Sequence, residues 1–484
     1  MQRRHFLATT AAAFAAPAAD KPIDVGLRKQ LFFDRRFITG AKGIAFTMHP
    51  PRKAGPILLP DMPWEKQHIG SYISVLEDEG MYKLWYMSFA GKGGGRLCYA
   101  TSKDGIEWQR PKLGRVDFNG SRDNNIVIAS FREGSVFLDP IAPPAQRFKT
   151  LASYGGDRPT PLGVNKSGTL TLFTSPDGID WNAEYPVLPF HPDSQNWLFY
   201  DTRLKKYVAY LRGWNPLRVV VRTEINSDAI LKPWPFQPAA NPRYLWRIFP
   251  WGGNWPPTPS TEFPTVLRCD RPNEDIYTPN VQQYPWADDA YFAFPSIFRH
   301  TAPPGSEPIP MAGVLEVQCA VSRDGISFDR MDRAAYIPRG LPHETDSHNA
   351  YMGVGMLRKG HEIYQYYAGG GTDHASSKPG PSALIRVVQR LDGFVSAGAT
   401  TAGGEFVTPL LQTSGRKLML NIDTGATGSA WVEAITSNGQ SIASERIVAN
   451  DTAAEVTFIR ALPAEPLRLR FKLDNARLYA FQFA

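Results

Sequence analysis

The stretch SKDGIEW at residues 102–108 decides the fold, because it returns as SPDGIDW at 175–181 and as SRDGISF at 322–328. The first two copies begin 73 residues apart, and the last two begin 147 residues apart, which is nearly two such steps. A fixed period of this length is typical of a repeat architecture in which each copy belongs to one structural unit. The spacing therefore predicts a series of similar modules, one of which has lost the phrase.

Each copy follows two runs that alternate apolar and polar residues, as β-strands do. In the first module, residues 71–89 form two such runs joined at the DEG of 78–80, and residues 95–102 supply a third. Comparable sets recur over about 60–393, which indicates five antiparallel modules of roughly 70 residues. Such modules bury both faces by stacking around a ring. The sequence predicts an all-β chain with a five-bladed β-propeller at 20–393, and residues 235–273 as an insertion that shapes a pocket.

The repeated phrase has the residue types of a tight turn. Asp followed by Gly suits a backbone with positive φ, the Ser hydroxyl can bond the turn backbone, and the final aromatic can pack between sheets. We therefore predict a structural and non-catalytic role for Asp104, Asp177 and Asp324.

The composition changes at residue 394, where Trp and Pro become rare and short alternating strands follow. This pattern predicts a separate β-sandwich at 394–484. Such a domain serves either as a packing partner or as a carbohydrate-binding accessory. The sequence shows no obvious aromatic platform there, which favours packing.

The N-terminus reads MQRRHFLATTAAAFAAPAAD, with two adjacent arginines, an Ala-rich run and small residues near a cleavage point. It resembles a twin-arginine export signal, which we assign to residues 1–19. The expected location is periplasmic or extracellular. The Ala-rich run is too short for a membrane span, and no other segment is long and apolar enough.

Composition excludes several function classes. The chain has 484 residues, of which 43% are apolar and 20% charged, as in a soluble globular protein. Its net charge of +7 is scattered, so a nucleic-acid partner is not expected. The three cysteines lack zinc or disulfide spacing, and HETDSH at 343–348 differs from the HExxH motif. We expect no metal, no cofactor and a monomer.

Propeller geometry sorts the polar residues by face. The hairpins between first and second strands gather on one face, where we expect four aspartates to form turns. These are Asp78, Asp139, Asp201 and Asp288. The opposite face gathers residues before the innermost strands and after the second strands. These are His68, Glu133, Tyr154, Arg158, Asp193, Arg212, Trp214, Asp275, Arg299, His300, Glu344, Asp346, His348, Asp373 and His374.

This second face combines acids, imidazoles, guanidinium groups and aromatic rings, which suits polyhydroxylated or acidic ligands. Glu344, Asp346 and His348 alternate, so an extended chain would direct all three side chains the same way. The alternative for that segment is a solvated loop.

Five modules, the S-x-D-G-I-x-[WF] phrase, an export signal and a trailing β-sandwich together resemble the five-bladed propeller glycosidases. These are the invertase/levanase, arabinanase and β-xylosidase-like group. The usual N-D-P-[NG] opening and the RDP and EC acid motifs of that group are absent here. The resemblance implies hydrolysis of glycosidic bonds in oligo- or polysaccharides, and it carries over no catalytic position.

Glycoside hydrolysis needs two carboxyl groups on either side of the scissile bond. From the face geometry we predict Asp193 or Asp275 as the base and Glu344 or Asp346 as the acid. The predicted substrate contacts are His68, Arg212, Tyr277, Arg299, His300 and His348. A non-catalytic glycan-binding propeller is the alternative, because fold alone implies no activity. A sialidase-like enzyme is disfavoured by the period and by the spacing inside the phrase.

Overall fold

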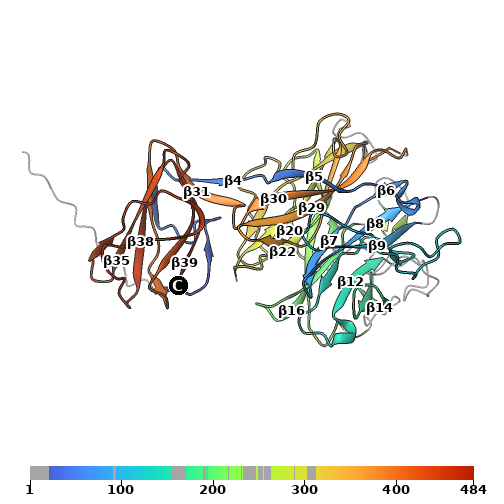
Figure 1. Ribbon diagram of the computed structural model, residues 1–484, viewed down its shortest axis with the longest axis horizontal. Coiled ribbons are helices and arrows are strands. Elements are labelled where there is room, and N and C mark those ends of the chain that lie inside the picture. Colours follow the sequence, from blue (N-terminus) through green and yellow to red (C-terminus); the bar gives the residue numbers. More distant parts are fainter. Residues whose placement is uncertain are drawn as a thin grey trace, which may run out of the picture. The chain divides into compact units, whose positions relative to one another are not determined.

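The computed structural model describes residues 21–90, 94–153, 170–188, 192, 194–215, 217–230, 232, 247–248, 254–255, 263–287, 289–301, 312–376 and 378–484. The described residues form strands β1 to β39 and two single-turn 3₁₀-helices, η1 (Pro63–Glu65) and η2 (Pro144–Gln146) (Figure 1). The predicted all-β class is confirmed. The predicted signal at 1–19 lies outside the described residues. No described helix is long and apolar enough to span a membrane.

The chain divides into two compact units. The terminal unit comprises Met1–Ala45 and Ala397–Ala484, and the repeat unit comprises Phe46–Ser396. The boundary at the C-terminal side lies within a few residues of the expected one. The N-terminal boundary differs, because the described residues before Phe46 belong to the terminal unit and not to the repeat.

Strand pairing explains this difference. β1 (Ile23–Gly26) pairs in parallel with β33 (Leu411–Thr413). β2 (Gln30–Leu31) and β3 (Gly40–Lys42) pair antiparallel with β39 (Ala476–Phe483) and β32 (Gly404–Val407). These partners lie more than 350 residues away along the chain, so no local sequence pattern could assign them.

The terminal unit holds two sheets. The first has the order β1-β33-β38-β32-β3, with β35 beside β38 and β36 beside β35. The second has the order β37-β34-β39-β31, with β2 beside β39. The remaining bounds are β31 (Val395–Ala399), β34 (Leu418–Asp423), β35 (Ser429–Thr436), β36 (Ser441–Ala443), β37 (Asn450–Glu455) and β38 (Leu467–Asp474).

The core of the terminal unit forms around Phe32. Its ring lies 5.3 and 5.8 Å from the rings of Phe406 and Phe471 in the first sheet, and 5.4 Å from Phe481 in the second. Phe32 therefore packs between the two sheets. A residue that the sequence assigned to the propeller is thus part of this second core.

The repeat unit consists of successive antiparallel sheets in chain order. The first contains β6 (His68–Ile69), β7 (Ser74–Asp78), β8 (Met81–Phe89), β9 (Gly95–Ser102) and β10 (Ile126–Ile128). The second contains β11 (Val136–Leu138), β12 (Phe148–Ser153), β13 (Leu170–Ser175) and β14 (Asn182–Leu188). The third contains β15 (Trp197–Asp201), β16 (Lys206–Trp214), β17 (Arg218–Ile225) and β20 (Thr265–Leu267).

Two smaller sheets follow and then a larger one. They are β21 (Glu274–Thr278) with β24 (Ser296–His300) and β25 (Gly313–Val317), and β22 (Val281–Gln283) with β23 (Tyr291–Ala293) and β26 (Ala320–Ser322). The last contains β27 (Asn349–Met352), β28 (Leu357–Lys359), β29 (Glu362–Gly370), β30 (Ser382–Arg390) and β5 (Arg52–Leu58). β4 (Ala45–Met48) begins at the boundary between the units, and β18 (Arg247–Ile248) pairs with β19 (Asn254–Trp255). Because β20 belongs to the third sheet, the predicted insertion at 235–273 includes one strand of the repeat.

Hydrogen bonds join successive sheets of the repeat unit. They are Val136 N to Ser74 Oγ (2.7 Å), Asn196 N to Glu133 O (2.6 Å), Trp197 Nε1 to Val281 O (2.5 Å), Asn280 Nδ2 to Met352 O (2.8 Å) and Val354 N to Ile73 O (2.8 Å). The last of these bonds returns to the first sheet. The series of contacts therefore closes on itself.

The three copies of the phrase form the same turn. In the first, the hydroxyl of Ser102 accepts the backbone N–H of Gly105, and Oδ1 of Asp104 accepts two further backbone N–H groups at 2.8 and 2.9 Å. The copies at 175–181 and 322–328 repeat these bonds. Gly105 has φ of 77°, which favours glycine. The structural role predicted for the three phrase aspartates is confirmed.

The aspartates of the first hairpins also form turns, as predicted for Asp139 and Asp201. Oδ1 of Asp139 accepts the N–H of Ile141, and Oδ1 of Asp201 accepts the N–H groups of Arg203 and Leu204. The second carboxylate oxygen of each bonds to the neighbouring sheet. Oδ2 of Asp139 accepts a hydrogen bond from the hydroxyl of Tyr207, and Oδ2 of Asp201 accepts one from the hydroxyl of Tyr291. Asp78 instead pairs with Lys83 and Arg147. Asp288 lies outside the described residues.

Candidate functional site

The candidate site begins with a buried charged group around Asp275, the second residue of β21. Its carboxylate is fully buried, and Oδ2 lies 2.8 Å from Nη1 of Arg218 and 3.3 Å from Nε2 of His300. Burial by itself raises the pKa of Asp275, but the charge of Arg218 and the hydrogen bond from His300 outweigh it, so that this pKa lies below its ordinary value. Asp275 is therefore an ionised carboxylate at neutral pH.

Tyr277, two residues further along β21, carries an aromatic and cationic layer. The guanidinium groups of Arg212 and Arg218 lie 4.3 and 5.3 Å from the centroid of its ring. The rings of Tyr351, on β27, and of His374, in the loop between β29 and β30, lie 5.7 and 4.9 Å away. Nη2 of Arg212 also donates to the carbonyl oxygen of Tyr277 at 2.9 Å. Cation–π contacts thus hold both arginines against the tyrosine.

A cavity of about 290 Å³ adjoins this layer. Tyr351 and His374 line it together with Asp373 on one side, and His68 and Phe89 of the first sheet line it on the other. The carboxylate of Asp373 accepts the backbone N–H groups of Gly313 and Ala375 at 3.0 and 2.8 Å. Polar groups and rings from two sheets therefore converge on one space, which is the usual character of a ligand site.

His68 contributes a neutral imidazole to this cavity. Its enclosure lowers the pKa to about 4, since the protonated form loses solvation there. Its Nε2 lies 3.4 Å from the hydroxyl of Ser71. At neutral pH His68 can donate or accept a hydrogen bond but carries no charge.

The acids predicted in the segment 343–348 differ from each other in environment. Residues 342–347 form turns, so the expectation of an extended chain that directs Glu344, Asp346 and His348 alike is wrong. Glu344 is exposed, and its Oε2 accepts the N–H of Leu341 at 2.7 Å. A turn forms here because this side chain bonds its own backbone three residues earlier.

Asp346 is buried against the last sheet. Its Oδ2 lies 2.6 Å from Nζ of Lys53 on β5 and accepts the hydroxyl of Tyr367 on β29 at 2.6 Å. The partners of Asp275 come instead from β17 and β24. Among the described residues, the hydrogen bonds and ion pairs of these two acids therefore involve different groups.

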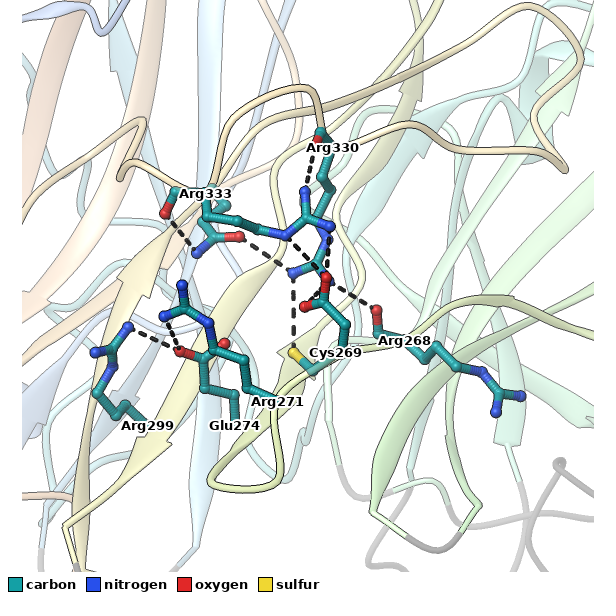
Figure 2. A network of polar contacts seen from close by, with 9 residues as sticks. Arg268, Cys269, Arg271, Glu274, Arg299, Arg330 and Arg333 are labelled. Atoms are coloured by element: carbon teal, nitrogen blue, oxygen red, sulfur yellow. Dashed lines mark hydrogen bonds and ion pairs between the residues drawn. The ribbon is translucent and has the colours of Figure 1, made fainter.

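Arg299 belongs to a separate polar network. Figure 2 shows Arg299 and Arg271 both reaching the buried Glu274, whose Oε1 lies 2.8 and 3.4 Å from their guanidinium nitrogens. Because successive residues of a strand point to opposite faces, Glu274 and its arginines lie on the other side of β21 from Asp275. Asp270 binds Arg330 in the same region, at 3.0 Å.

The predicted site residues are thus only partly brought together. His300, Arg212 and Tyr277 gather around Asp275. His68 lines the adjoining cavity together with Tyr351 and His374, whose rings contact Tyr277. His348 is partly exposed and lies 3.1 Å from the hydroxyl of Ser347. Asp193, Tyr154 and Arg158 lie outside the described residues.

Sequence reasoning missed Arg218 and Tyr351. Arg218 is the first residue of β17 and lies opposite Trp214, the last residue of β16. It therefore follows a predicted second strand, and this position could have identified it from the sequence. Tyr351 lies within β27, at the edge of the last sheet, and reads as a core residue. Its contact with Tyr277 depends on a different sheet and leaves no trace in the local sequence.

The described residues hold no group of three or more His, Cys, Asp or Glu side chains that could bind a metal ion. Cys98, Cys269 and Cys319 are free thiols. Burial raises the pKa of Cys269 to about 12, so this thiol is protonated at neutral pH.

Comparison with known proteins gives distant likenesses. No family model matches the chain. Two uncharacterised proteins of Mycobacterium tuberculosis, Rv1502 and MT1551, are each 27% identical over 140 residues. The match covers 27% of this chain and 46% of each relative, so the chain spans about half the length of the curated relatives it matches.

Solved structures that resemble the chain include several enzymes. A GH62 α-L-arabinofuranosidase catalytic domain from Coprinopsis cinerea is 12% identical and covers 70% of this chain and 97% of its own, with a TM-score of 0.42. An N-acetylgalactosamine deacetylase from F. plautii is 10% identical and covers 72% of this chain and 96% of its own, with a TM-score of 0.44. The GH32 β-fructofuranosidase BmSUC1 of Bombyx mori is 11% identical and covers 90% of this chain and 95% of its own, with a TM-score of 0.39. Likenesses at this level do not identify an activity.

Proposed function

We propose that the repeat unit is a five-bladed β-propeller and that the chain is a glycoside hydrolase-like protein acting on glycosidic bonds of oligo- or polysaccharides. The five blades are supported by the 73-residue step of the phrase and by the hydrogen bonds that lead from each sheet to the next and back to the first. We further propose that the terminal unit is a β-sandwich, since Phe32 packs between its two sheets.

One observation carries the proposed function: an ionised buried carboxylate, Asp275, lies behind a layer of rings and guanidinium groups that borders a cavity. Sugar rings bind through their apolar faces to aromatic side chains and through their hydroxyls to polar groups. Tyr351 and His374 supply rings of the cavity wall and pack against Tyr277, while His68 and Asp373 supply polar groups of the wall. This combination suits an uncharged or acidic sugar.

In the proposed reaction one carboxyl group protonates the leaving oxygen, and a second carboxylate either activates water or attacks the sugar carbon directly to form an intermediate that water then hydrolyses. Asp275 suits the role of base, because Arg218 and His300 keep it ionised. Asp193 remains the alternative base. Glu344 and Asp346 are the candidates for the acid. The proposed substrate contacts are His68, Arg212, Tyr277, Arg299, His300 and His348.

The decisive experiment is a hydrolysis screen of the chain on plant and algal polysaccharides, followed by kinetics of substitutions. We expect Asp275→Asn or Asp193→Asn to lower kcat by about 10²-fold or more, the usual effect of losing an acid–base group. Glu344→Gln and Asp346→Asn identify the acid in the same way. Asp180→Asn is the control, because Asp180 is half exposed and pairs with Arg115 at the surface. Full activity in both Asp275→Asn and Asp193→Asn would contradict the assignment.

The second candidate function is glycan binding without catalysis. It is favoured by the complete burial of Asp275 and by the pairing of Asp346 with Lys53. Calorimetry with the oligosaccharides of the same screen distinguishes the two functions. Binding without any released product supports the binding module and excludes the hydrolase for that ligand.

We also propose export of the protein to the periplasm or the exterior through the twin-arginine-type signal at 1–19. The support is the sequence of that segment, with Arg3 and Arg4 before an Ala-rich run. Replacing both arginines by lysine should retain the protein in the cytoplasm. Immunoblots of fractionated cells test this, and unchanged export of the double variant would contradict it.

A further inference from the structure

The outer face of the first sheet of the terminal unit carries a partly exposed tryptophan. Along β35, alternate residues are buried: Ala430, Val432 and Ala434 point into the core, so Trp431 and Glu433 point outward. Figure 1 shows β35 beside β38, whose outward residues are charged. We call the outward side of β35, β38, β32 and β3, together with Arg446 beside Trp431, the Trp431 face.

Basic groups flank the Trp431 ring on both sides. Strand register places Lys472 of β38 directly opposite Trp431. On the other side, the guanidinium of the exposed Arg446 lies 5.8 Å from the ring centroid. Side chains that lie opposite each other across paired strands are within contact range. An aromatic surface thus lies between two cations from different segments.

The Trp431 face as a whole is basic. Its basic side chains are Lys42, Arg446, Arg468, Arg470 and Lys472, and its acidic side chains are Glu405, Glu433 and Asp474. Glu433 lies 2.9 Å from both Arg470 and Lys472, whose charges lower its pKa. The acids on this face are thus fewer than the cations, which leaves an excess of positive charge.

We propose that the Trp431 face binds an acidic polysaccharide, with a sugar ring stacked on Trp431 and its carboxylate or sulfate groups paired with Arg446 and Lys472. Charge complementarity selects an anionic ligand, and guanidinium groups bind carboxylate and sulfate oxygens well. The flat ring presents an apolar surface to the face of a sugar. Trp431 is half-buried between charged neighbours, so it cannot insert into a bilayer as an interfacial anchor does.

This inference goes beyond the proposed hydrolysis, because it concerns a different unit from the cavity and requires no bond cleavage. If Trp431 binds a sugar ring, it is an aromatic platform in a region where the sequence showed no obvious one. The sequence alone does not reveal it, because a single tryptophan in an alternating strand could equally well point into the core.

Affinity electrophoresis of the full chain tests the proposal, with polygalacturonate or chondroitin sulfate in the gel and dextran as the neutral comparison. We expect retardation in both acidic gels and none in dextran, and we expect it to weaken as salt is added. Trp431→Ala and Arg446→Ala should each weaken the affinity about tenfold, which corresponds to about 1.4 kcal/mol. Arg446 is exposed, so its removal does not threaten folding.

The matched control is Lys417→Ala, which removes the exposed cation that directly precedes β34 and pairs with Glu455 of β37, in the other sheet of the same unit. It should leave retardation unchanged, whereas Glu433→Gln should increase it by removing a negative charge.

Equal weakening by Lys417→Ala and Arg446→Ala would overturn the proposal. Retardation in dextran, or binding only to vesicles of phosphatidylserine and phosphatidylcholine, would overturn it as well. A chain without hydrolytic activity that is still retarded supports this inference and contradicts only the hydrolase proposal.

Discussion

The indole N–H of Trp85 donates a 2.7 Å hydrogen bond to the carbonyl oxygen of Gly178, which lies in the repeated turn of the next sheet. Trp85 is the fifth residue of the nine-residue strand β8. The same relationship joins Tyr210 to Gly325 and Tyr366 to Gly105, each at 2.7 Å. Both tyrosines are likewise the fifth residues of nine-residue strands. The repeated phrase therefore joins neighbouring sheets, which explains why the chain contains it three times.

We expect Gly178→Ala to destabilise the protein strongly. Gly178 has φ of 83°, and a Cβ built there overlaps the ring of Trp85. The positive φ costs about 1 kcal/mol for alanine, and the overlap adds about 1–3 kcal/mol. Urea unfolding measures the total loss in the free energy of unfolding.

Gly360→Ala is the matched control in the same unit. Gly360 has φ of 61°, but no atom lies within 4 Å of a Cβ built there. Its substitution should cost about 1 kcal/mol, the backbone contribution alone. If the two variants lost the same free energy of unfolding, the contact with Trp85 would add nothing to the cost of a side chain at Gly178.

Tyr366→Phe tests the hydrogen bond without changing the packing of the ring. The variant removes the hydroxyl that donates to the carbonyl of Gly105 and leaves that buried oxygen without this donor. We expect a loss of about 1–2 kcal/mol in the free energy of unfolding. Calorimetric melting of the wild type and the variant measures it, and an unchanged melting temperature would contradict the role of this bond.

Asp275→Asn should destabilise the repeat unit at neutral pH by about 3–5 kcal/mol, because it leaves the charge of Arg218 buried without its carboxylate partner. The pKa of Asp275 is lower in the folded chain than in the unfolded chain. Its contribution is therefore present above about pH 4 and lost as the pH falls further, through the folded pKa.

The stability difference between wild type and Asp275→Asn should accordingly shrink as the pH falls below about 4. Urea unfolding at a series of pH values measures it. A difference that stays constant over this range would mean that Asp275 does not titrate with folding.

His68 should titrate near pH 4, well below an ordinary histidine. Because the folded chain binds this proton less readily than the unfolded chain, stability due to His68 falls as the pH drops from about 6.5 towards 4. NMR of the ring protons gives the pKa directly, and His68→Gln assigns the signal. A His68 signal that titrates near 6.5 would contradict the enclosure of this side chain.

Local chemistry explains which parts of the fold could be predicted from the sequence. The turns of Asp104, Asp177 and Asp324 depend on bonds within four residues, so their residue types alone identify them. Alternation of apolar residues likewise predicted the strands. The turn at Glu344 was mistaken for an extended chain, because the alternation of Glu344, Asp346 and His348 is also the pattern of a strand. In the structure the side chain of Glu344 instead bonds the backbone N–H of Leu341.

The sequence by itself determined the all-β class, the period and the structural role of the repeated phrase, because each depends on neighbours along the chain. Only the tertiary structure decided that residues 23–42 pair with strands of the C-terminal region, that Asp346 meets Lys53, and that Asp275 meets Arg218. The physical reason is the same in every case. Burial of a charge or an apolar ring is stable only against a complementary partner, and in the ion pairs of Asp275 and Asp346 that partner lies 57 and 293 residues away.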